Sequence, residues 1–296
     1  MRFAVLGAPD SWYFRDLVRA AGPRHEVVAA PFSEIAATLD AGGLQIRAGD
    51  VELRDFDATL VRTMPPGSLE QVVFRMDCLL RHEAAGGVVL NPPRAIEAAV
   101  DKFLTSAKLL AAGLKTPRTI VCQSADEALT AFQTLGGDVV LKPIFGGEGR
   151  GLIRLDDEGF TERVCKSLVQ LGAVLYVQEF IPHAGADLRL FVLGNRVFGM
   201  KRSNASDWRT NVSRGATTAP LEVTADLAKL AQTAAAAVGA PIAGVDLLPG
   251  NDGELYVLEV NAVPGWKALA QTLDFDMAAA VLDFTAARVR ERRERP

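Results

Sequence analysis

Short apolar runs at the start of the chain alternate with segments in which apolar residues recur at helical spacing. The helical spacing covers residues 12–21 and 69–85. The runs predicted to be strands cover residues 2–6, 26–30, 57–62 and 88–90. Because strands that alternate with helices form parallel sheets, the pattern predicts a small parallel sheet that ends near Pro92 and Pro93.

The rest of the chain carries more strands than helices and predicts two α+β lobes. Helical spacing covers residues 95–112, just before Gly113, and the alanine-rich residues 225–238. The predicted strands cover residues 119–122, 139–142, 152–155, 175–180, 188–193, 196–202, 244–248 and 255–260. We therefore expect an α/β fold class with three lobes, at residues 1–93, 94–181 and 182–296.

The composition is that of an ordinary globular protein, with 49% hydrophobic and 23% charged residues. The formal net charge of −4 gives no long-range attraction to nucleic acid or to an anionic membrane. No apolar stretch reaches the ~18 residues of a membrane span, and the first apolar run is too short for a signal peptide. The three cysteines lack the spacing of a metal or disulfide framework. We expect a cytoplasmic protein without nucleic-acid or membrane partners.

A glycine-rich stretch between the predicted strands at 139–142 and 152–155 is the first candidate site. Its glycines are Gly146, Gly147, Gly149 and Gly151. Closely spaced glycines let backbone N–H groups approach phosphate oxygens without obstruction by side chains. The stretch lacks the Lys-Ser/Thr of a P-loop, and Leu152 stands where a dinucleotide fingerprint needs its third glycine. Considered alone, it is equally compatible with a flexible hairpin turn.

Polar residues at the ends of apolar segments add to this candidate. Lys142 ends the strand before the glycines and could hold a cation against the same phosphates, as could the Asp101-Lys102 pair. Gln178 and Glu179 end another apolar strand, where backbone groups and a carboxylate could hold an adenine and its ribose. The alternatives are solvated surface lysines and a plain strand end.

Asp246, Glu259 and Asn261 form the most specific local cluster. Glu259 and Asn261 are two residues apart, so they share one face of a strand, and an antiparallel neighbour can bring Asp246 alongside them. Mg²⁺ takes a few carboxylate or amide oxygens and completes its octahedron with waters and nucleotide phosphates. The cluster therefore predicts a site for a magnesium nucleotide, and the alternative is a row of surface acids on an alternating strand.

A dense set of mostly basic residues surrounds a Ser/Asn-rich loop between these clusters. The set comprises Asp187, Arg189, Lys201, Arg202, Arg209, Asn211 and Arg214. In a protein of net negative charge such a concentration suggests recognition of phosphate or carboxylate groups. A solvated basic loop is the alternative.

In this order the motifs resemble the ATP-grasp superfamily and, within it, the RimK-like α-L-glutamate ligases. The resemblance runs from Asp101-Lys102 to the C-terminus. It is carried further by Asp187-Leu-Arg-Leu-Phe-Val, Lys201-Arg202, Asp207-Trp-Arg-Thr-Asn-Val-Ser-Arg-Gly, Gly244-Val-Asp and Glu259-Val-Asn-Ala-Val-Pro-Gly. It implies an ATP-grasp fold, in which a Rossmann-like N-terminal lobe precedes two α+β lobes that clasp ATP.

The resemblance also implies roles for individual residues. The implied nucleotide contacts are Lys102, Lys142, Gly146, Gly147, Gly149, Gly151, Gln178, Glu179, Phe180, Asp187 and Arg189. The implied ligands of Mg²⁺ or Mn²⁺ are Asp246, Glu259 and Asn261. The implied catalytic residues, near the reacting phosphate and the acceptor pocket, are Arg202, Asn211 and Arg214. Arg62 and Arg209 are implied as further anchors for carboxylate or phosphate.

The activity implied by the resemblance is that of an ATP-dependent carboxylate–amine ligase. Such an enzyme forms an amide through an acyl phosphate and needs no protein nucleophile. The implied amine is L-glutamate, and the implied acceptor is a small-molecule carboxylate such as a one-carbon cofactor of the tetrahydromethanopterin or methanofuran type. A homo-oligomer is compatible with the family. The chain departs from the family's usual pattern at Ala216 and at Trp266-Lys267, which lies on the acceptor side.

Three other functions remain open at this point. The first is a glutamate ligase that modifies a protein C-terminus, and the second is a non-catalytic nucleotide-binding regulator, which would have lost a metal ligand or an arginine. The third is a nicotinamide-dependent oxidoreductase, suggested by the βαβ start, although Leu6-Gly7-Ala8-Pro9 lacks the glycine fingerprint.

Overall fold

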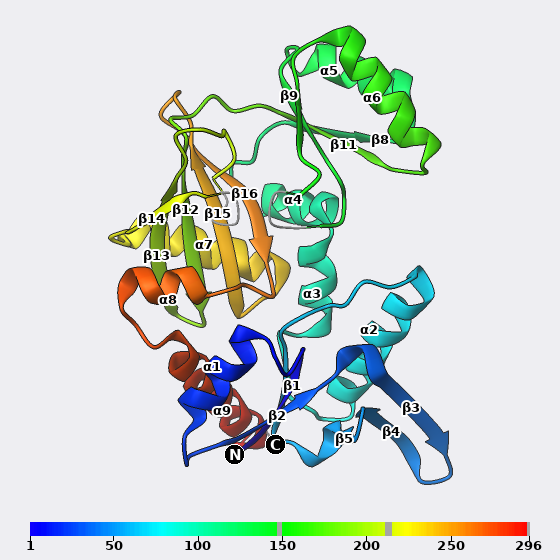
Figure 1. The fold of residues 1–296 in the computed structure, drawn as a ribbon, viewed down its shortest axis with the longest axis vertical. Helices are drawn as coiled ribbons and strands as arrows, with labels where there is room; N and C mark the ends of the chain where they lie inside the picture. The colour runs from blue at the N-terminus through cyan, green and yellow to red at the C-terminus, as the bar shows by residue number, and fades with distance from the viewer. Residues whose placement is uncertain (147–149, 211–214, 295–296) are drawn as a thin grey trace.

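The computed structural model describes residues 1–146, 150–210 and 215–294, and their strands form four sheets (Figure 1). The first sheet has the order β2-β1-β6-β7 and is parallel throughout, as the sequence pattern predicts. Its strands are β1 (Arg2–Leu6), β2 (Glu26–Ala30), β6 (Ala58–Val61) and β7 (Val89–Leu90). Helices α1 (Trp12–Ala21) and α2 (Leu69–Ala84) connect them. Four of the five residues of β1 are buried, because helices cover both faces of the sheet.

Two features of this part of the chain differ from the prediction. An antiparallel sheet of β3 (Ile35–Asp40), β4 (Gly43–Ala48) and β5 (Val51–Glu52) follows β2 and was not predicted. The single helix predicted over residues 95–112 is wrong, because it is two helices, α3 (Pro93–Val100) and α4 (Lys102–Ala111). Asp101 separates them in extended conformation, with φ −90° and ψ 107°, and its side chain accepts the N–H of Leu104 at 2.9 Å as the N-cap of α4.

The central sheet has the order β10-β9-β11-β8 and is antiparallel. Its strands are β8 (Thr119–Cys122), β9 (Val139–Lys142), β10 (Ile153–Leu155) and β11 (Leu175–Glu179). Helices α5 (Ala125–Thr134) and α6 (Glu158–Gln170) pack together on one face and bury its apolar side chains. The hairpin of β9 and β10 encloses the glycine-rich stretch, as expected from the sequence.

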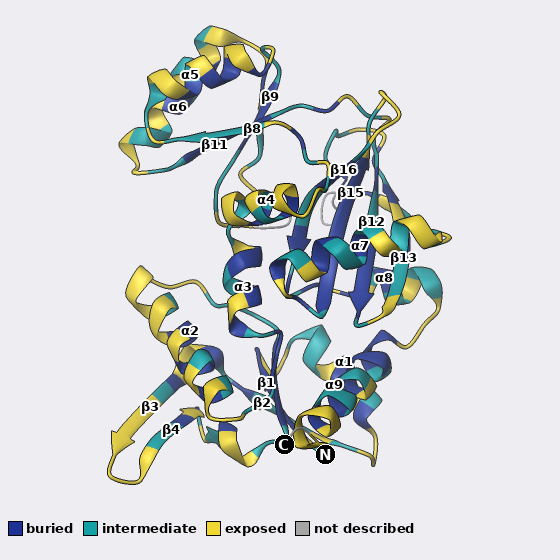
Figure 2. Ribbon diagram, turned by 180° about the vertical axis from the view of Figure 1, so that it is seen from behind, coloured by how far each residue is buried: buried dark blue, intermediate teal, exposed yellow. Residues whose placement is uncertain are grey.

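The C-terminal sheet has the order β14-β13-β12-β15-β16 and is antiparallel throughout. Its strands are β12 (Ala186–Leu193), β13 (Arg196–Ser203), β14 (Thr217–Pro220), β15 (Ile242–Pro249) and β16 (Leu255–Asn261). Helix α7 (Ala225–Val238) lies across one face, which Figure 2 shows from behind. Leu190, Val192, Val245 and Leu247 pack in the same cluster as the alanines of α7. The opposite face carries the charged residues of the site.

The end of the chain returns to the first sheet. After β16 come α8 (Lys267–Leu273) and α9 (Met277–Glu294), and α9 packs beside α1 near both termini (Figure 1). Residues of α9 share a buried cluster with Phe3, Val5 and Leu17. The sequence does not predict this return, and the three-lobe division remains a prediction.

Asn91 joins the N-terminal lobe to the C-terminal sheet. It is buried directly after β7, and its Nδ2 donates to the carbonyl oxygens of Ile242, at 2.6 Å, and of Ala262. Its Oδ1 accepts the N–H of Ile242 at 3.0 Å. One side chain therefore satisfies three buried backbone groups at the ends of two strands.

Among the residues that the structure describes, no helix is long and apolar enough to cross a membrane.

We expect Asn91→Ala to lower the free energy of unfolding by about 3 kcal/mol, because three hydrogen bonds of ~1 kcal/mol each are lost and their backbone partners stay buried. Urea unfolding followed by circular dichroism measures the change. Asn251→Ala is the matched control: Asn251 is exposed, and its replacement should change stability by less than ~0.5 kcal/mol. Equal stability of the two variants would contradict this account of Asn91.

Candidate functional site

A cavity lies between the central and C-terminal sheets and gathers most of the residues predicted for the site. The predicted residues that line it are Lys102, Lys142, Gln178, Glu179, Phe180, Asp187, Arg202, Arg209, Asp246 and Glu259. They come from the start of α4, from β9 and β11, and from β12, β13, β15 and β16. Chain segments far apart in the sequence thus supply one set of charged and polar groups.

Two lysines enter the cavity from different elements. Lys142 ends β9, and its Nζ donates to Oε1 of Gln178 at 2.5 Å. Burial lowers the pKa of Lys142 to about 8, although the Glu259 carboxylate opposes this shift. Lys102 opens α4, and its Nζ donates to the carbonyl oxygen of Gly146 at 2.5 Å. Lys102 therefore reaches the glycine-rich stretch, and both ammonium groups are available to an anion.

Gln178 is held by a buried polar network that sequence reasoning missed in part. Its Nε2 donates to Thr119 Oγ1 at 2.9 Å and to the Tyr176 hydroxyl at 3.1 Å. That hydroxyl also shares a hydrogen bond of 2.7 Å with Ser106. Tyr176 lines the cavity beside Gln178 because the two are two residues apart on β11. The same spacing rule that was applied to Glu259 and Asn261 would have found it.

Apolar side chains form the part of the cavity near the end of β11. These residues are Val140, Phe180, Ile181, Trp208, Leu248 and Leu258. The rings of Phe180 and Trp208 meet edge to face, with centroids 5.9 Å apart. Glu179 stands beside this apolar part, and its Oε1 accepts the N–H of Arg118 at 2.7 Å. We call this apolar part of the cavity the apolar slot. With a carboxylate at its side, it suits a nucleoside base and its ribose.

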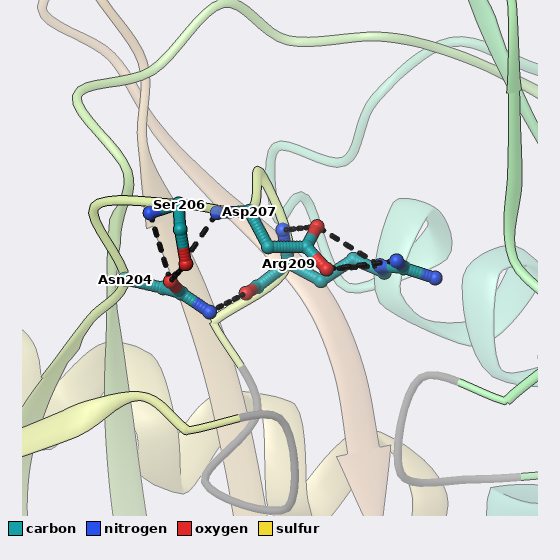
Figure 3. Close-up of polar contacts among 4 residues, drawn as sticks. All are labelled: Asn204, Ser206, Asp207 and Arg209. Carbon is teal, nitrogen blue, oxygen red and sulfur yellow. Dashed lines mark hydrogen bonds and ion pairs between the residues drawn. The ribbon is translucent and has the colours of Figure 1, made fainter.

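The loop that carries Trp208 is braced by its own polar side chains (Figure 3). Oδ1 of Asn204 accepts from the N–H and hydroxyl of Ser206, both at 3.0 Å, and from the N–H of Asp207 at 3.2 Å. The Asp207 carboxylate accepts the N–H of Arg209 at 2.9 Å and its guanidinium at 2.7 Å. This bracing within the loop, together with the contact of Trp208 with Phe180, holds Trp208 and Arg209 at the cavity wall.

Four charged side chains alternate in sign on the face of the C-terminal sheet opposite α7; Asp187, Arg202 and Asp246 are buried, and Arg189 is half-buried. Arg202 donates to both carboxylate oxygens of Asp187, at 2.7 and 2.6 Å, and lies 3.1 Å from Oδ1 of Asp246. Arg189 donates to the same Oδ1 at 2.7 Å. Burial alone would raise the pKa of Asp246, but Arg189 and Arg202 outweigh burial and hold that pKa below its ordinary value. Asp246 therefore stays ionised.

The local backbone explains why Arg189 can reach Asp246. A Cβ at Gly244 would clash with the guanidinium of Arg189, so only glycine leaves room for it there. Gly244 and Asp246 are two residues apart on β15 and face the same side of the sheet as Arg189, which is the register partner of Asp246 on β12. Glycine at position 244 therefore allows Arg189 to orient the Asp246 carboxylate.

The predicted metal ligands lie on neighbouring strands. Asp246 and Glu259 are paired in register, and Asn261 is paired with Gly244. The contacts of Asp246 with both arginines fall on Oδ1, which leaves Oδ2 without a partner among the described residues. Oδ1 of Asn261 accepts the N–H of Val263 at 2.8 Å, and Asn261 is not part of the cavity lining. Over the described ranges no three His, Cys, Asp or Glu side chains gather to hold a metal.

The two carboxylates nonetheless fit a hard divalent cation. Mg²⁺ is bound by one or two protein carboxylates and otherwise by water and phosphate oxygens. Asp246 and Glu259 provide that number beside two lysines that attract phosphates. The donor set thus fits a magnesium nucleotide better than a cation held by protein alone.

Some of the remaining predicted residues lie outside the described ranges, and the others do not line the cavity. Gly147, Gly149, Asn211 and Arg214 lie outside the described residues. Gly146 directly precedes the undescribed residues 147–149, Gly151 lies two residues after them, and both have positive φ, of 130° and 72°. Arg189 supports Asp246 instead of lining the cavity. Arg62 lies at the end of β6, beside the segment after β16.

Comparison with known proteins agrees with this geometry. The family model of the RimK-like ATP-grasp domain matches residues 99–285. The chain is 31% identical to the tetrahydromethanopterin:α-L-glutamate ligase of Methanosarcina acetivorans, over 93% of this chain and 95% of that one. It is 32% identical to a probable α-L-glutamate ligase of Aliivibrio fischeri, over 96% of this chain and 95% of the relative.

Solved structures show the same fold. The ATP-grasp ligase PsnB in complex with its minimal precursor superposes with a TM-score of 0.78 at 23% identity, covering 97% of this chain and 98% of that one. The RimK domain protein of Sphaerobacter thermophilus superposes with a TM-score of 0.72 at 25% identity, covering 97% of this chain and all of that one. The predicted ATP-grasp fold is confirmed, and the chain belongs to the RimK-like family of ATP-grasp ligases.

Proposed function

We propose that the protein uses Mg-ATP to join L-glutamate to a carboxylate carried by a small molecule. The observation that carries this proposal is the cavity in which two lysines face two carboxylates beside an apolar slot. This combination matches the three parts of a magnesium nucleotide: phosphates, cation and base. The names of the relatives supply the amine and the class of acceptor.

In this proposal each group of residues has a distinct task. Lys102 and Lys142 hold the phosphates, while Gln178 keeps the Lys142 ammonium in place through their hydrogen bond. Asp246 and Glu259, with Asn261, hold Mg²⁺ or Mn²⁺. ATP, when bound, would supply the γ-phosphoryl group that converts the acceptor carboxylate into an acyl phosphate and leaves ADP. The glutamate amine would then attack the acyl carbon, expel phosphate and leave the amide. The protein contributes position and charge, as in other phosphoryl transfers.

Arg202 acts mainly on other protein groups in this arrangement. Both of its hydrogen bonds to Asp187 are buried, and its guanidinium also contacts Asp246. Burial alone would lower the pKa of Arg202, but these carboxylates raise it, so the guanidinium stays charged. We infer that Arg202 orients the cation-binding carboxylate and adds positive charge near the reacting phosphate. Asn211 and Arg214 remain predicted as catalytic residues.

A small-molecule acceptor is favoured by the relatives that cover most of the chain. Three tetrahydromethanopterin:α-L-glutamate ligases match it at 31–35% identity. We therefore propose a carboxylate acceptor of the one-carbon cofactor type. The alternatives of a protein C-terminus as acceptor and of a non-catalytic regulator are decided by the experiment below.

The first test measures phosphate release from Mg-ATP with L-glutamate and a panel of carboxylate acceptors, including tetrahydromethanopterin and peptides with free C-termini. Mass spectrometry of the products should show whole glutamyl units on a small acceptor. We expect Asp246→Asn to reduce turnover on the order of 100-fold, equal to ~3 kcal/mol, because the cation loses a charged ligand. Asp226→Asn is the matched control, since Asp226 is exposed on the same lobe.

The outcomes separate the candidate functions. Glutamyl units on a peptide would replace the small-molecule acceptor with a protein C-terminus. Binding of ATP without release for any acceptor would favour the regulator, and absence of ATP binding would contradict the assignment of the cavity.

A second prediction concerns the pH dependence of ATP binding. Because the pKa of Lys142 lies at about 8, its ammonium is charged below that pH and loses its proton above it. Phosphates favour the charged form, so the affinity for Mg-ATP should fall as the pH rises through about 8. In Lys142→Arg the charge persists across this range, and the pH dependence should disappear. Calorimetric titration between pH 7 and 9, with protons counted in two buffers, measures the effect. A pH profile that is the same in both proteins would exclude Lys142 as its source.

A further inference from the structure

Arg62 is a half-buried arginine whose guanidinium has few polar partners. It directly follows β6, at the carboxyl edge of the parallel sheet, beside Gly7, which directly follows β1. Its Nη2 donates to the carbonyl oxygen of Pro264 at 2.8 Å. Its Nε is buried and has no hydrogen-bond partner among the described residues. Arg62 thus makes one hydrogen bond where its fork offers five donors.

No carboxylate neutralises this charge within the described part of the chain. Arg189 and Arg202 face aspartates at 2.6–2.7 Å, whereas the Arg62 guanidinium has no ion pair there. Burial lowers the pKa of Arg62 to about 10, although Tyr13 opposes this shift. A partly buried charge without an acidic partner costs free energy in the folded protein, and a carboxylate ligand would offset that cost.

Aromatic rings hold the guanidinium in a fixed orientation. It lies 4.3 Å from the centre of the Trp266 ring and 5.1 Å from that of Tyr13. These two rings meet edge to face at 5.1 Å, and Nε1 of the buried Trp266 donates to Asp16 at 2.9 Å. A Cβ at Gly265 would clash with the Tyr13 hydroxyl, so glycine is needed there for Tyr13 to pack. We call the two rings of Tyr13 and Trp266 the cradle. The cradle fixes the orientation of the Arg62 guanidinium but does not neutralise its charge.

One nitrogen of the guanidinium remains available. Nη1 has no hydrogen bond in the described structure and is not among its buried unpaired atoms, so it reaches solvent. Tyr13 lies in the first turn of α1, which has no acidic residue. The partial positive charge of a helix N-terminus adds to that of Arg62. The exposed edge of the cradle is therefore suited to an anion.

The cradle lies within reach of the reaction centre. Pro264 follows Glu259 by five residues, which span at most about 18 Å. β16 runs from the apolar slot at Leu258 through Glu259 to Asn261 and then to the segment that contacts Arg62. The cradle is thus at the end of the site away from the base, at the carboxyl edge where open α/β sheets bind ligands.

We propose that Arg62, Tyr13 and Trp266 form a subsite that binds a carboxylate of one of the two substrates, distant from the groups that react. The proposal rests on the ligase function above for the identity of those substrates. Two sources offer the same chemistry: a carboxylate of the incoming L-glutamate and a second acid group on the acceptor. The subsite holds the substrate end while phosphoryl transfer proceeds at the other end.

The test compares Arg62→Gln, Arg62→Lys and the control Arg15→Gln, which changes an exposed arginine of α1. KM is measured separately for ATP, L-glutamate and tetrahydromethanopterin. Loss of a charge-assisted hydrogen bond of ~1.5–3 kcal/mol should raise KM about 10- to 100-fold for one carboxylate substrate in Arg62→Gln. Arg62→Lys should recover part of this loss because it keeps the charge without the fork. KM for ATP should stay unchanged.

Folding stability separates a binding role from a structural one. We expect Arg62→Gln to keep the Tm of the parent protein, because the lost bond to Pro264 is offset by removal of a buried charge. A fall in Tm with every KM unchanged would show a structural tether and overturn the proposal. The substrate whose KM rises identifies the source of the carboxylate.

Calorimetry with Mg²⁺ and a non-hydrolysable ATP analogue keeps the test independent of turnover. The probes are L-glutamate, its α-amide and γ-amide analogues, and tetrahydromethanopterin, each titrated into the parent protein and Arg62→Gln. If the parent ligates nothing but binds a carboxylate probe through Arg62, the ligase function fails and the subsite stands. If no probe binds in an Arg62-dependent way, the subsite is overturned, whether or not ligation occurs.

Discussion

The clamp of two arginines on Asp246 is the interaction on which the rest of the site depends. It joins three neighbouring strands, because Asp187 and Arg189 lie on β12, Arg202 on β13 and Asp246 on β15. Each buried ion costs several kcal/mol in lost hydration, and the network recovers this only because two positive and two negative charges alternate at hydrogen-bond distance. The two arginines keep the Asp246 carboxylate ionised, and their closest contacts fall on Oδ1, so Oδ2 can face a cation. The site therefore exists only when the C-terminal sheet is formed in register.

Strand β16 connects the three parts of the site. Leu258 belongs to the apolar slot, Glu259 to the cation site, and Asn261 leads into the segment that packs on Tyr13 and Arg62. The nucleotide end is completed by the central sheet, and the opposite end is completed by the parallel sheet. Helix α9 and Asn91 tie that sheet to the C-terminal lobe, which fixes the distance between the two ends. The arrangement of lobes thus fixes the separation between the nucleotide cavity and the proposed carboxylate subsite.

Local signals in the sequence predicted the elements, and long-range pairing explains what they missed. The βα start, the hairpin around the glycines and the pairing of Asp246 with Glu259 follow from periodicity and spacing. The break at Asp101 was missed because apolar spacing continues across it and only a capping hydrogen bond marks it. Strands β3 to β5 were missed because most of β3 is exposed and lacks alternation. The pairing of Arg202 with Asp187 needs two strands in register, which no local pattern contains.

Arg62 and Arg202 differ in the partners of their guanidinium groups, and this difference separates a proposed ligand-binding role from a role in orienting protein carboxylates. Arg202 forms ion pairs with Asp187 and Asp246, and its positive charge stabilises these two carboxylates. Arg62 meets only rings and one carbonyl oxygen, and cation–π contacts of ~0.5–2 kcal/mol each are smaller than the cost of burying an unpaired charge. A carboxylate ligand would offset the free-energy cost of the unpaired Arg62 charge, and this favours its binding. Trp266 is the ring nearer the guanidinium, at 4.3 Å against 5.1 Å for Tyr13, so it is the closer of the two rings that orient Arg62 in the proposed subsite.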